Sequence, residues 1–286
     1  MQQKYTIAEL ELKADEIRQD IIRMLEHAGS GHPGGSLGQA DIFTALYFAV
    51  LKHDPKNPYW EDRDILVQSN GHTVPVRYAT MANVGYFDRK ELLTLRQLGT
   101  RLQGHPERKK LPGLETTSGP LGSGLSQACG MALALRMDKQ QHRWVYVTTG
   151  DGELDEGNNW EAIMLASKYK LTNLIAIVDR NNIQIDGPTE VVMPLEDLRA
   201  KWEAFGWHVI EIDGNNIEAV IDACAMAKAI VEKPVVIIAH TIPGRGVSFM
   251  EYDFHWHGAA PNAEQAKVAM KELRTLQGKI QNEADR

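Results

Sequence analysis

Apolar residues recur along the first 25 positions of the chain at intervals of three and four, the spacing of one face of an α-helix. They are Ile7, Leu10, Ala14, Ile17, Ile21 and Leu25. Thr6 and Glu9 have the spacing of a capping box in front of this run, and Gly29 follows it. The pattern therefore predicts a helix that begins after Thr6 and ends at Gly29.

A second capping box is predicted at Ser36 and Gln39. These residues precede an apolar helix that we expect over residues 42–51, and the glycine-rich segment over residues 30–35 is expected to be a loop.

From residue 64 onward, short apolar runs alternate with segments of helical spacing. Strands are predicted over residues 64–68, 144–149, 174–179, 207–212 and 235–240. Helices are predicted over residues 126–137, 156–169, 195–205 and 217–231. This alternation is typical of an α/β fold with a parallel sheet flanked by helices on both faces.

The domain organisation expected from the sequence is simple. No composition shift marks a linker, so we expect a single domain over residues 1–286 with a helical N-terminal elaboration. A polar segment over residues 261–286 is expected to form a C-terminal helical tail.

Charge and composition exclude several classes of function. The net charge is −7 and the only short basic run is Arg108-Lys109-Lys110, which argues against nucleic acid as a partner. Cys129 and Cys224 have no paired framework, so we expect free thiols in a reducing compartment. Apolar runs are too short to span a bilayer and the N-terminus has no signal core, so a cytoplasmic protein without membrane contact is expected.

The strand over residues 144–149 ends in Gly150-Asp151-Gly152, directly before a helix. Ligands bind parallel sheets at this edge, and backbone amides at a helix start favour a phosphate. An aspartate beside a phosphate indicates a bridging Mg²⁺. The tripeptide alone is more typical of a turn, but Asn181 follows the next strand and is expected at the same edge. The pair favours a metal site.

Four of the ten histidines stand in loops that are rich in glycine or proline: His32, His72, His105 and His257. Any one alone is more typical of an ordinary loop histidine. A zinc-type cage is not indicated, because only His255 and His257 are close in sequence and no third ligand lies nearby.

Taken together, these segments resemble the N-terminal region of the transketolases, over about residues 30–258. The most specific parts are His32-Pro33-Gly34 and His105-Pro106-Glu107, and Ser118-Gly119-Pro120-Leu121-Gly122 also matches. The resemblance implies the thiamine-diphosphate-binding fold in its diphosphate-binding form. It also implies transfer of a two-carbon ketol unit from a ketose phosphate to an aldose phosphate, as from xylulose 5-phosphate to ribose 5-phosphate.

The same resemblance implies a set of site residues. The metal ligands would be Asp151, Asn181 and the main chain of Ile183, with Mg²⁺ as the ion and Ca²⁺ or Mn²⁺ able to replace it. Thiamine diphosphate would be bound by His72, Gly119, Pro120, Leu121, Gly152, Glu156, Asn181, Ile185 and His257. The catalytic residues would be His32, His72, His105, His257 and Glu156.

Individual roles follow from the family in the same way. His32 and His257 would face the reacting oxygens of the substrate, since neutral imidazoles carry protons near pH 7. His72 would lie near the diphosphate, and His105 would bind the terminal hydroxyl of the donor. Glu156, with Glu161, would join a carboxylate network at a subunit interface. The alternative for these glutamates is favourable charge at a helix N-terminus.

The resemblance also implies a partner. A complete transketolase has a second α/β domain that holds the aminopyrimidine and supplies an activating glutamate, and that domain is not found in this sequence. We therefore expect a separate C-terminal transketolase subunit with a pyrimidine-binding domain, an α2β2 assembly, and no activity from this chain alone.

Other functions remain open on the sequence alone. The α subunit of a 2-oxo acid dehydrogenase shares the Gly-Asp-Gly motif but is not expected to carry His32, His72 and His105 in these settings. A deoxyxylulose-phosphate synthase relative, a transketolase for an unusual sugar, and a non-catalytic cofactor-binding half are further alternatives. The segment Ile242-Pro243-Gly244-Arg245-Gly246 departs from the usual family pattern, which leaves the acceptor sugar open.

Overall fold

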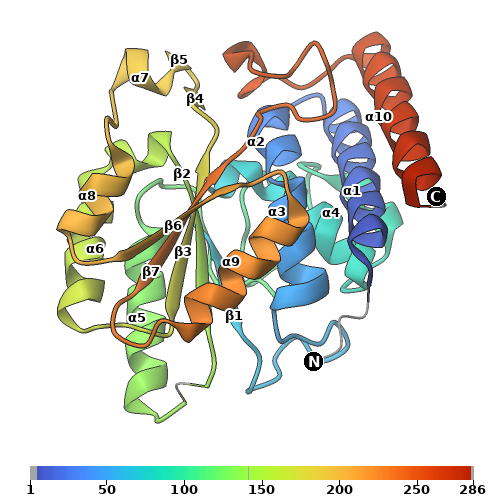
Figure 1. Ribbon diagram of the computed structural model, residues 1–286. Coiled ribbons are helices and arrows are strands. Elements are labelled where there is room, and N and C mark those ends of the chain that lie inside the picture. The colour runs from blue at the N-terminus through green and yellow to red at the C-terminus, as the bar shows by residue number, and fades with distance from the viewer. Residues whose placement is uncertain (1–4, 141, 285–286) are drawn as a thin grey trace.

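A five-stranded, all-parallel sheet forms the centre of the protein (Figure 1). The computed structural model describes residues 5–140 and 142–284. The strand order is β1-β2-β3-β7-β6, with bounds β1 Ile65–Gln68, β2 Val145–Gly150, β3 Leu174–Arg180, β7 Val235–His240 and β6 His208–Asp213. The five strands predicted from the apolar runs are confirmed, each within two residues.

The helices cover both faces of the sheet, as the alternating pattern predicts. On one face pack α1 Ile7–Ala28, α3 Ala40–Ala45, α4 Val74–Val84 and α9 Ile217–Ala229. On the other face pack α5 Gly124–Met137, α6 Gly157–Lys168 and α8 Leu198–Ala204. Side chains of β3 alternate between the two cores, with Ile175 and Ile177 on the first and Ala176 and Val178 on the second. Every residue of β3 is buried, which accounts for its unbroken apolar run.

The first helix begins as predicted. In α1 the Glu9 amide donates to the Thr6 hydroxyl oxygen (3.2 Å), and the Thr6 amide donates to the Glu9 carboxylate (2.7 Å). Gly29 ends the helix in the left-handed region, with φ 63°. The C-terminal helix α10, Ala263–Ala284, runs beside α1 and buries Ala266, Ala269 and Leu273 in the same core (Figure 1).

The capping box predicted at Ser36 and Gln39 is wrong. Helix α2, Pro33–Gly38, begins inside the segment expected to be a loop, because a proline with its fixed φ favours the first helical position. The Ser36 hydroxyl donates to the carbonyl of His32 (2.6 Å), within the helix. Gln39 lies between α2 and α3, and the chain continues into a π-helical turn, Leu46–Val50.

Short elements not anticipated from the sequence gather where β3 ends. The hairpin β4 Ile183–Gln184 with β5 Gly187–Pro188 leads into the short helix α7, Thr189–Val192 (Figure 1). The short η helices are η2 Gly71–Thr73, η3 Arg89–Thr94, η4 Gly152–Asp155 and η5 Phe254–Trp256. None of the helices within the described residues has the length and apolar character needed to cross a membrane.

Replacing Ile177 with alanine tests the importance of β3. This side chain is 1% exposed in the middle of the sheet, so the cavity left by Ile177→Ala is expected to lower the free energy of unfolding by about 2–5 kcal/mol. The control Val231→Ala, at a side chain that is 77% exposed, is expected to change it by less than about 0.5 kcal/mol. Urea denaturation of the two variants measures both values, and equal values would contradict the assignment of β3 to the core.

Candidate active site

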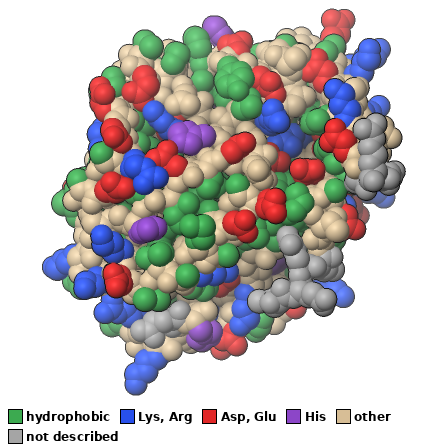
Figure 2. Space-filling view, viewed as in Figure 1, with side chains coloured by type: hydrophobic (Ala, Val, Ile, Leu, Met, Phe, Trp, Pro, Cys, Tyr) green, Lys and Arg blue, Asp and Glu red, His purple; other side chains and the backbone are tan. Residues whose placement is uncertain are grey.

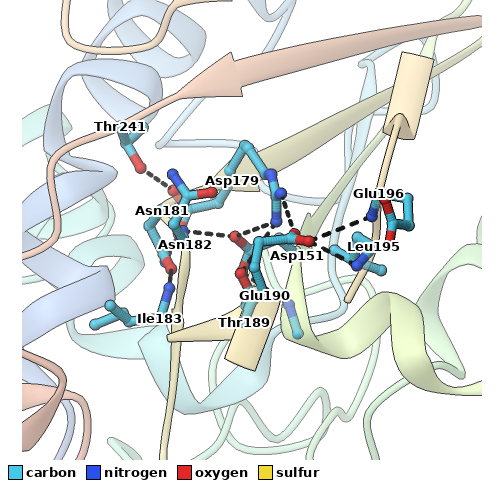
Figure 3. Close-up of polar contacts among 12 residues, drawn as sticks. Asp151, Asp179, Asn181, Asn182, Ile183, Thr189, Glu190, Leu195, Glu196 and Thr241 are labelled. Atoms are coloured by element: carbon cyan, nitrogen blue, oxygen red, sulfur yellow. Dashed lines mark hydrogen bonds and ion pairs between the residues drawn. The ribbon is translucent and has the colours of Figure 1, made fainter. Parts of the chain in front are cut away.

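The ends of β2 and β3 bring the two predicted metal-binding side chains together. The strands pair in parallel with Gly150 opposite Asp179, and the Asp151 amide donates to the carbonyl of Asp179 (3.2 Å). Asp151 is 1% exposed and Asn181 is 7% exposed. Both therefore lie buried at one edge of the sheet, as the sequence pattern predicts (Figure 3).

The Asp151 carboxylate is held on both oxygens. Its Oδ1 accepts from the Gly152 amide (2.8 Å), and its Oδ2 accepts from the Asn182 amide (2.6 Å) and lies 3.3 Å from Nη1 of Arg180. Burial nevertheless raises the pKa of Asp151 to about 6, against the lowering effect of these donors. The surroundings therefore do not fully compensate the negative charge.

A second buried carboxylate, Asp179, lies beside the first. Its oxygens accept from the Thr241 hydroxyl and from Nδ2 of Asn181 (2.8 Å). Burial raises the pKa of Asp179 to about 7, and the nearby Asp151 charge adds to that rise. A cation bound between two such buried acids would stabilise their charged forms.

The donor set at this edge fits a hard cation. In the described part of the chain no group of three or more His, Cys, Asp or Glu side chains has an arrangement suited to a metal ion. An ion held here would depend on one carboxylate, the amide oxygen of Asn181, a main-chain carbonyl and oxygens of an anionic ligand. That mixture suits Mg²⁺, which binds few protein oxygens and shares the rest with phosphates.

A cavity of about 260 Å³ opens above the two carboxylates. Most of the predicted site residues line it: His32, His72, His105, Gly119, Leu121, Asp151, Gly152, Asn181, Ile183, Ile185 and His257. Two predicted residues, Pro120 and Glu156, do not line it and are exposed. Predicted site residues as far apart in the sequence as His32 and His257 therefore line one pocket.

Three imidazoles form one wall of this cavity. The ring of His32 lies 5.0 Å from that of His72 and 5.7 Å from that of His257, and the last two are 5.2 Å apart. Burial lowers the pKa of His32 to about 4, with further lowering by His257 and by nearby Arg96. Burial also lowers the pKa of His72, far below its usual range, and that of His257. The three rings are therefore neutral near pH 7.

Neutral rings each carry one N–H donor and one acceptor nitrogen. Nδ1 of His32 and Nδ1 of His257 are buried and have no hydrogen-bond partner among the described residues. Buried polar atoms without a partner are costly, so these nitrogens indicate a polar ligand in the cavity. His105 is exposed at the rim, where partial burial and Arg96 lower its pKa.

Close backbone contacts explain why glycines border the histidines. A Cβ at Gly71, next to His72, would lie 2.4 Å from the Ser118 hydroxyl oxygen. A Cβ at Gly34, two residues after His32, would lie 3.1 Å from the carbonyl oxygen of Trp256. Glycine therefore lets the loops that carry the histidines approach one another.

Glu153, which was not predicted from the sequence, connects three parts of the site. Its buried carboxylate accepts from the amides of Gly122 (2.8 Å) and Gly150 (3.0 Å) and from the Ser69 hydroxyl. Burial raises its pKa. These contacts fix the loop that carries Gly119 against the Gly150-Asp151-Gly152 turn. Its position directly after that turn was the available signal, but partners 31 and 84 residues away are not visible in a sequence.

Glu156 and Glu161 lie away from the cavity. Glu156 is the exposed N-cap residue of α6 and its side chain makes no capping hydrogen bond, while Glu161 is exposed on the same helix. Their acidic charge at a helix start is favourable in itself. The interface role of Glu156 stays a prediction.

Comparison with known proteins identifies the family. Residues 10–278 match the family described as transketolase, thiamine diphosphate binding domain. The chain belongs to the transketolase family. This match confirms the predicted family and its thiamine-diphosphate-binding domain.

Relatives that are named as transketolase subunits match over almost their whole length. One is a subunit of the apulose-4-phosphate transketolase of Phocaeicola vulgatus, 41% identical over 96% of this chain and 97% of its own. Another is the 6-deoxy-6-sulfo-D-fructose transketolase subunit SqwG of a Clostridium species, 44% identical over 93% of this chain and 96% of its own.

Relatives that are named simply as transketolase are longer. Human transketolase is 38% identical over 91% of this chain, which corresponds to 41% of the human protein. The solved structure of a transketolase mutant from Pichia stipitis superposes with a TM-score of 0.87 at 35% identity, over 96% of this chain and 41% of the other. This chain therefore aligns with almost the whole of relatives named as transketolase subunits and with less than half of those named simply as transketolase, which confirms the predicted transketolase-type subunit.

The neutral state of His32 predicts a pH dependence of stability. Between pH 6.5 and about 4 the unfolded chain protonates this imidazole and the folded chain does not, so acid favours unfolding. From pH 8 to pH 5 the wild type should therefore lose about 2 kcal/mol more unfolding free energy than His32→Asn, which cannot titrate there. The raised pKa values of Asp151 and Asp179 act in the opposite direction but are common to both proteins. Urea denaturation at the two pH values measures the difference. Equal losses of unfolding free energy in the two proteins would refute the neutral state of buried His32.

Proposed function

We propose that this chain is the cofactor-binding subunit of a two-chain transketolase that uses thiamine diphosphate and Mg²⁺. The enzyme would transfer a two-carbon ketol unit from a ketose phosphate to an aldose phosphate. The observation that carries the proposal is the cavity in which buried Asp151 and Asn181 lie opposite three neutral imidazoles.

Mg²⁺ would be held by Asp151, Asn181 and the main-chain carbonyl of Ile183, and Ca²⁺ or Mn²⁺ could replace it. The raised pKa of Asp151 supports this assignment, because a cation would stabilise its charged form. The Gly152 amide and His72 would bind the diphosphate at the same edge. When bound, thiamine diphosphate supplies the electron sink that stores the two-carbon unit between donor and acceptor.

The apolar and backbone groups at the rim would hold the rings of the cofactor. Gly119, Pro120 and Leu121 lie on the loop fixed by Glu153, and Ile185 lies at the tip of the β4–β5 hairpin. Leu121 is 40% exposed and Ile185 is 65% exposed, so both offer apolar surface to a ring.

The histidines would handle protons and hydroxyl groups of the sugar. A neutral imidazole donates a hydrogen bond through N–H and accepts a proton at its other nitrogen. His32 and His257 have buried Nδ1 atoms without partners among the described residues, which supports their contact with reacting oxygens. His105, exposed at the rim, would bind the terminal hydroxyl of the donor.

A second subunit would complete the site. We propose that it carries the pyrimidine-binding domain with the activating glutamate, and that two copies of each chain form an α2β2 assembly. The match to relatives that are named as single subunits of transketolases supports this. Exposed apolar side chains beside the site support it as well: Leu121, Ile185, Val191, Val192 and Met193. Glu156 would lie at that interface.

The cellular setting that we propose is the cytoplasm, without nucleic-acid or membrane partners. On the face drawn in Figure 2, basic side chains are dispersed among acidic ones, so that a polyanion would meet few clustered positive charges there. A transketolase acting on an unusual sugar is the second candidate. The names of the relatives, which refer to apulose 4-phosphate and to a sulfonated fructose, favour testing it with a panel of ketose donors.

Removal of the metal-binding carboxylate is the first test of the proposed function. Uptake of thiamine diphosphate by the two-chain complex should be saturable and Mg²⁺-dependent, and Asp151→Ala should weaken it by at least about 100-fold. The control Asp222→Ala, an exposed acid on α9, should bind as the wild type does. Equilibrium dialysis with labelled cofactor measures uptake, and unchanged binding in Asp151→Ala would refute the metal site.

Dependence on a partner is the second test. The purified chain with thiamine diphosphate and Mg²⁺ should not convert xylulose 5-phosphate and ribose 5-phosphate, and co-expression with its C-terminal subunit should give activity. In that complex His257→Ala should lower kcat by roughly 100-fold, because it removes a donor to reacting oxygens. Activity from the single chain would contradict the two-chain proposal.

A further inference from the structure

Asp179 is a buried carboxylate that contacts both predicted metal-binding residues. It is 2% exposed, at the end of β3 between β2 and β7. Its main-chain carbonyl accepts from the Asp151 amide (3.2 Å), and its Oδ2 accepts from Nδ2 of Asn181 (2.8 Å). One residue therefore fixes the backbone of one ligand and the side chain of the other (Figure 3).

The contact to Asn181 determines which side of its amide is free. With Nδ2 bound to Asp179, the oxygen Oδ1 is turned the other way, where it accepts from the Ile183 amide (3.0 Å). A carbonyl oxygen has two lone pairs, so one remains for a cation. An amide rotated by half a turn would present an NH₂ group instead, which repels a cation.

The Asp179 carboxylate is held on both of its oxygens. Its Oδ1 accepts from the Thr241 hydroxyl, which follows β7, while Oδ2 is bound to Asn181. Thr241 is also buried, and it holds the carboxylate through the oxygen that Asn181 does not contact. The two contacts keep the carboxylate in a single orientation.

We propose that Asp179 is a positioning residue for the metal site, which orients the Asn181 amide oxygen toward the cation that the proposed function requires. The inference rests on that proposed function. It predicts a change in metal affinity with a smaller change in turnover once metal is saturating, because Asp179 contacts neither substrate nor cofactor in this role.

The test measures the Mg²⁺ concentration that gives half-maximal uptake of thiamine diphosphate by the two-chain complex. Asp179→Leu, which has a similar shape but no acceptor for Nδ2 of Asn181, should raise it by about 10–100-fold, the usual effect of losing a partner that orients a metal ligand. Thr241→Val is the matched control: it removes the other hydrogen bond to the same carboxylate and leaves Asn181 bound. We expect it to raise the midpoint by less than about 3-fold, far below the loss that a misoriented ligand causes.

A double variant provides the rescue. In Asp179→Asn with Asn181→Asp, the new amide donates to the new carboxylate, so the hydrogen bond returns with reversed direction and the net charge is unchanged. We expect it to recover at least about 10-fold of the lost Mg²⁺ affinity. Far-UV circular dichroism and the melting temperature establish that each variant is folded.

The outcomes separate this inference from the proposed function. No Mg²⁺-dependent uptake by the wild type would refute both. Wild-type uptake with an unchanged midpoint in Asp179→Leu would refute only the positioning role, as would an equal effect of Thr241→Val or a failed rescue. A loss as large as that of Asp151→Ala would make Asp179 a direct ligand, which also overturns the proposal.

Discussion

The parallel pairing of β2 with β3 is the constraint on which the rest of the site depends. It places Gly150 opposite Asp179, so that the chain leaves both strands at one edge and delivers Asp151 and Asn181 to the same point. A shift of one residue would turn these side chains to opposite faces of the sheet. The register is fixed by the cores on both faces, where Ile175 and Ile177 pack on one side and Ala176 and Val178 on the other. Packing of the sheet therefore determines the chemistry at its end.

The site combines two buried acids, whose negative charge is not fully compensated, with three imidazoles that are neutral near pH 7. Burial raises the pKa of Asp151 and Asp179 and lowers that of His32, His72 and His257, so each group is pushed toward its uncharged form. A cation between the acids and a diphosphate would restore the charged carboxylates at little cost to the imidazoles. The same burial would thus favour cation binding at the acids and proton transfer at the imidazoles within one small cavity.

The sequence predicted what depends on local pattern. The five strands were identified because each is a continuous apolar run, and the Gly150-Asp151-Gly152 turn because it follows such a run. The start of α2 was missed because the capping pattern at Ser36 and Gln39 outweighed the proline at position 33. The family resemblance supplied the histidines, and the structure brings the rings of His32, His72 and His257 to distances of 5.0, 5.2 and 5.7 Å from one another. The roles of Glu153 and Asp179 were not identified. Glu153 contacts residues 31 and 84 positions away, and Asp179 contacts Asp151 and Thr241, which directly follow the neighbouring strands, besides the nearby Asn181.

The features of the cavity also bear on how the protein gains stability. Two buried Nδ1 atoms, of His32 and His257, have no partner among the described residues, and two buried acids lack full compensation. Each of these groups costs folding free energy that the hydrophobic core must offset. A ligand that satisfies them binds the folded chain and not the unfolded one, and so raises its stability in proportion to RT ln(1 + [L]/Kd). Binding of a cofactor and a cation at this site would therefore offset part of the folding free energy that these groups cost.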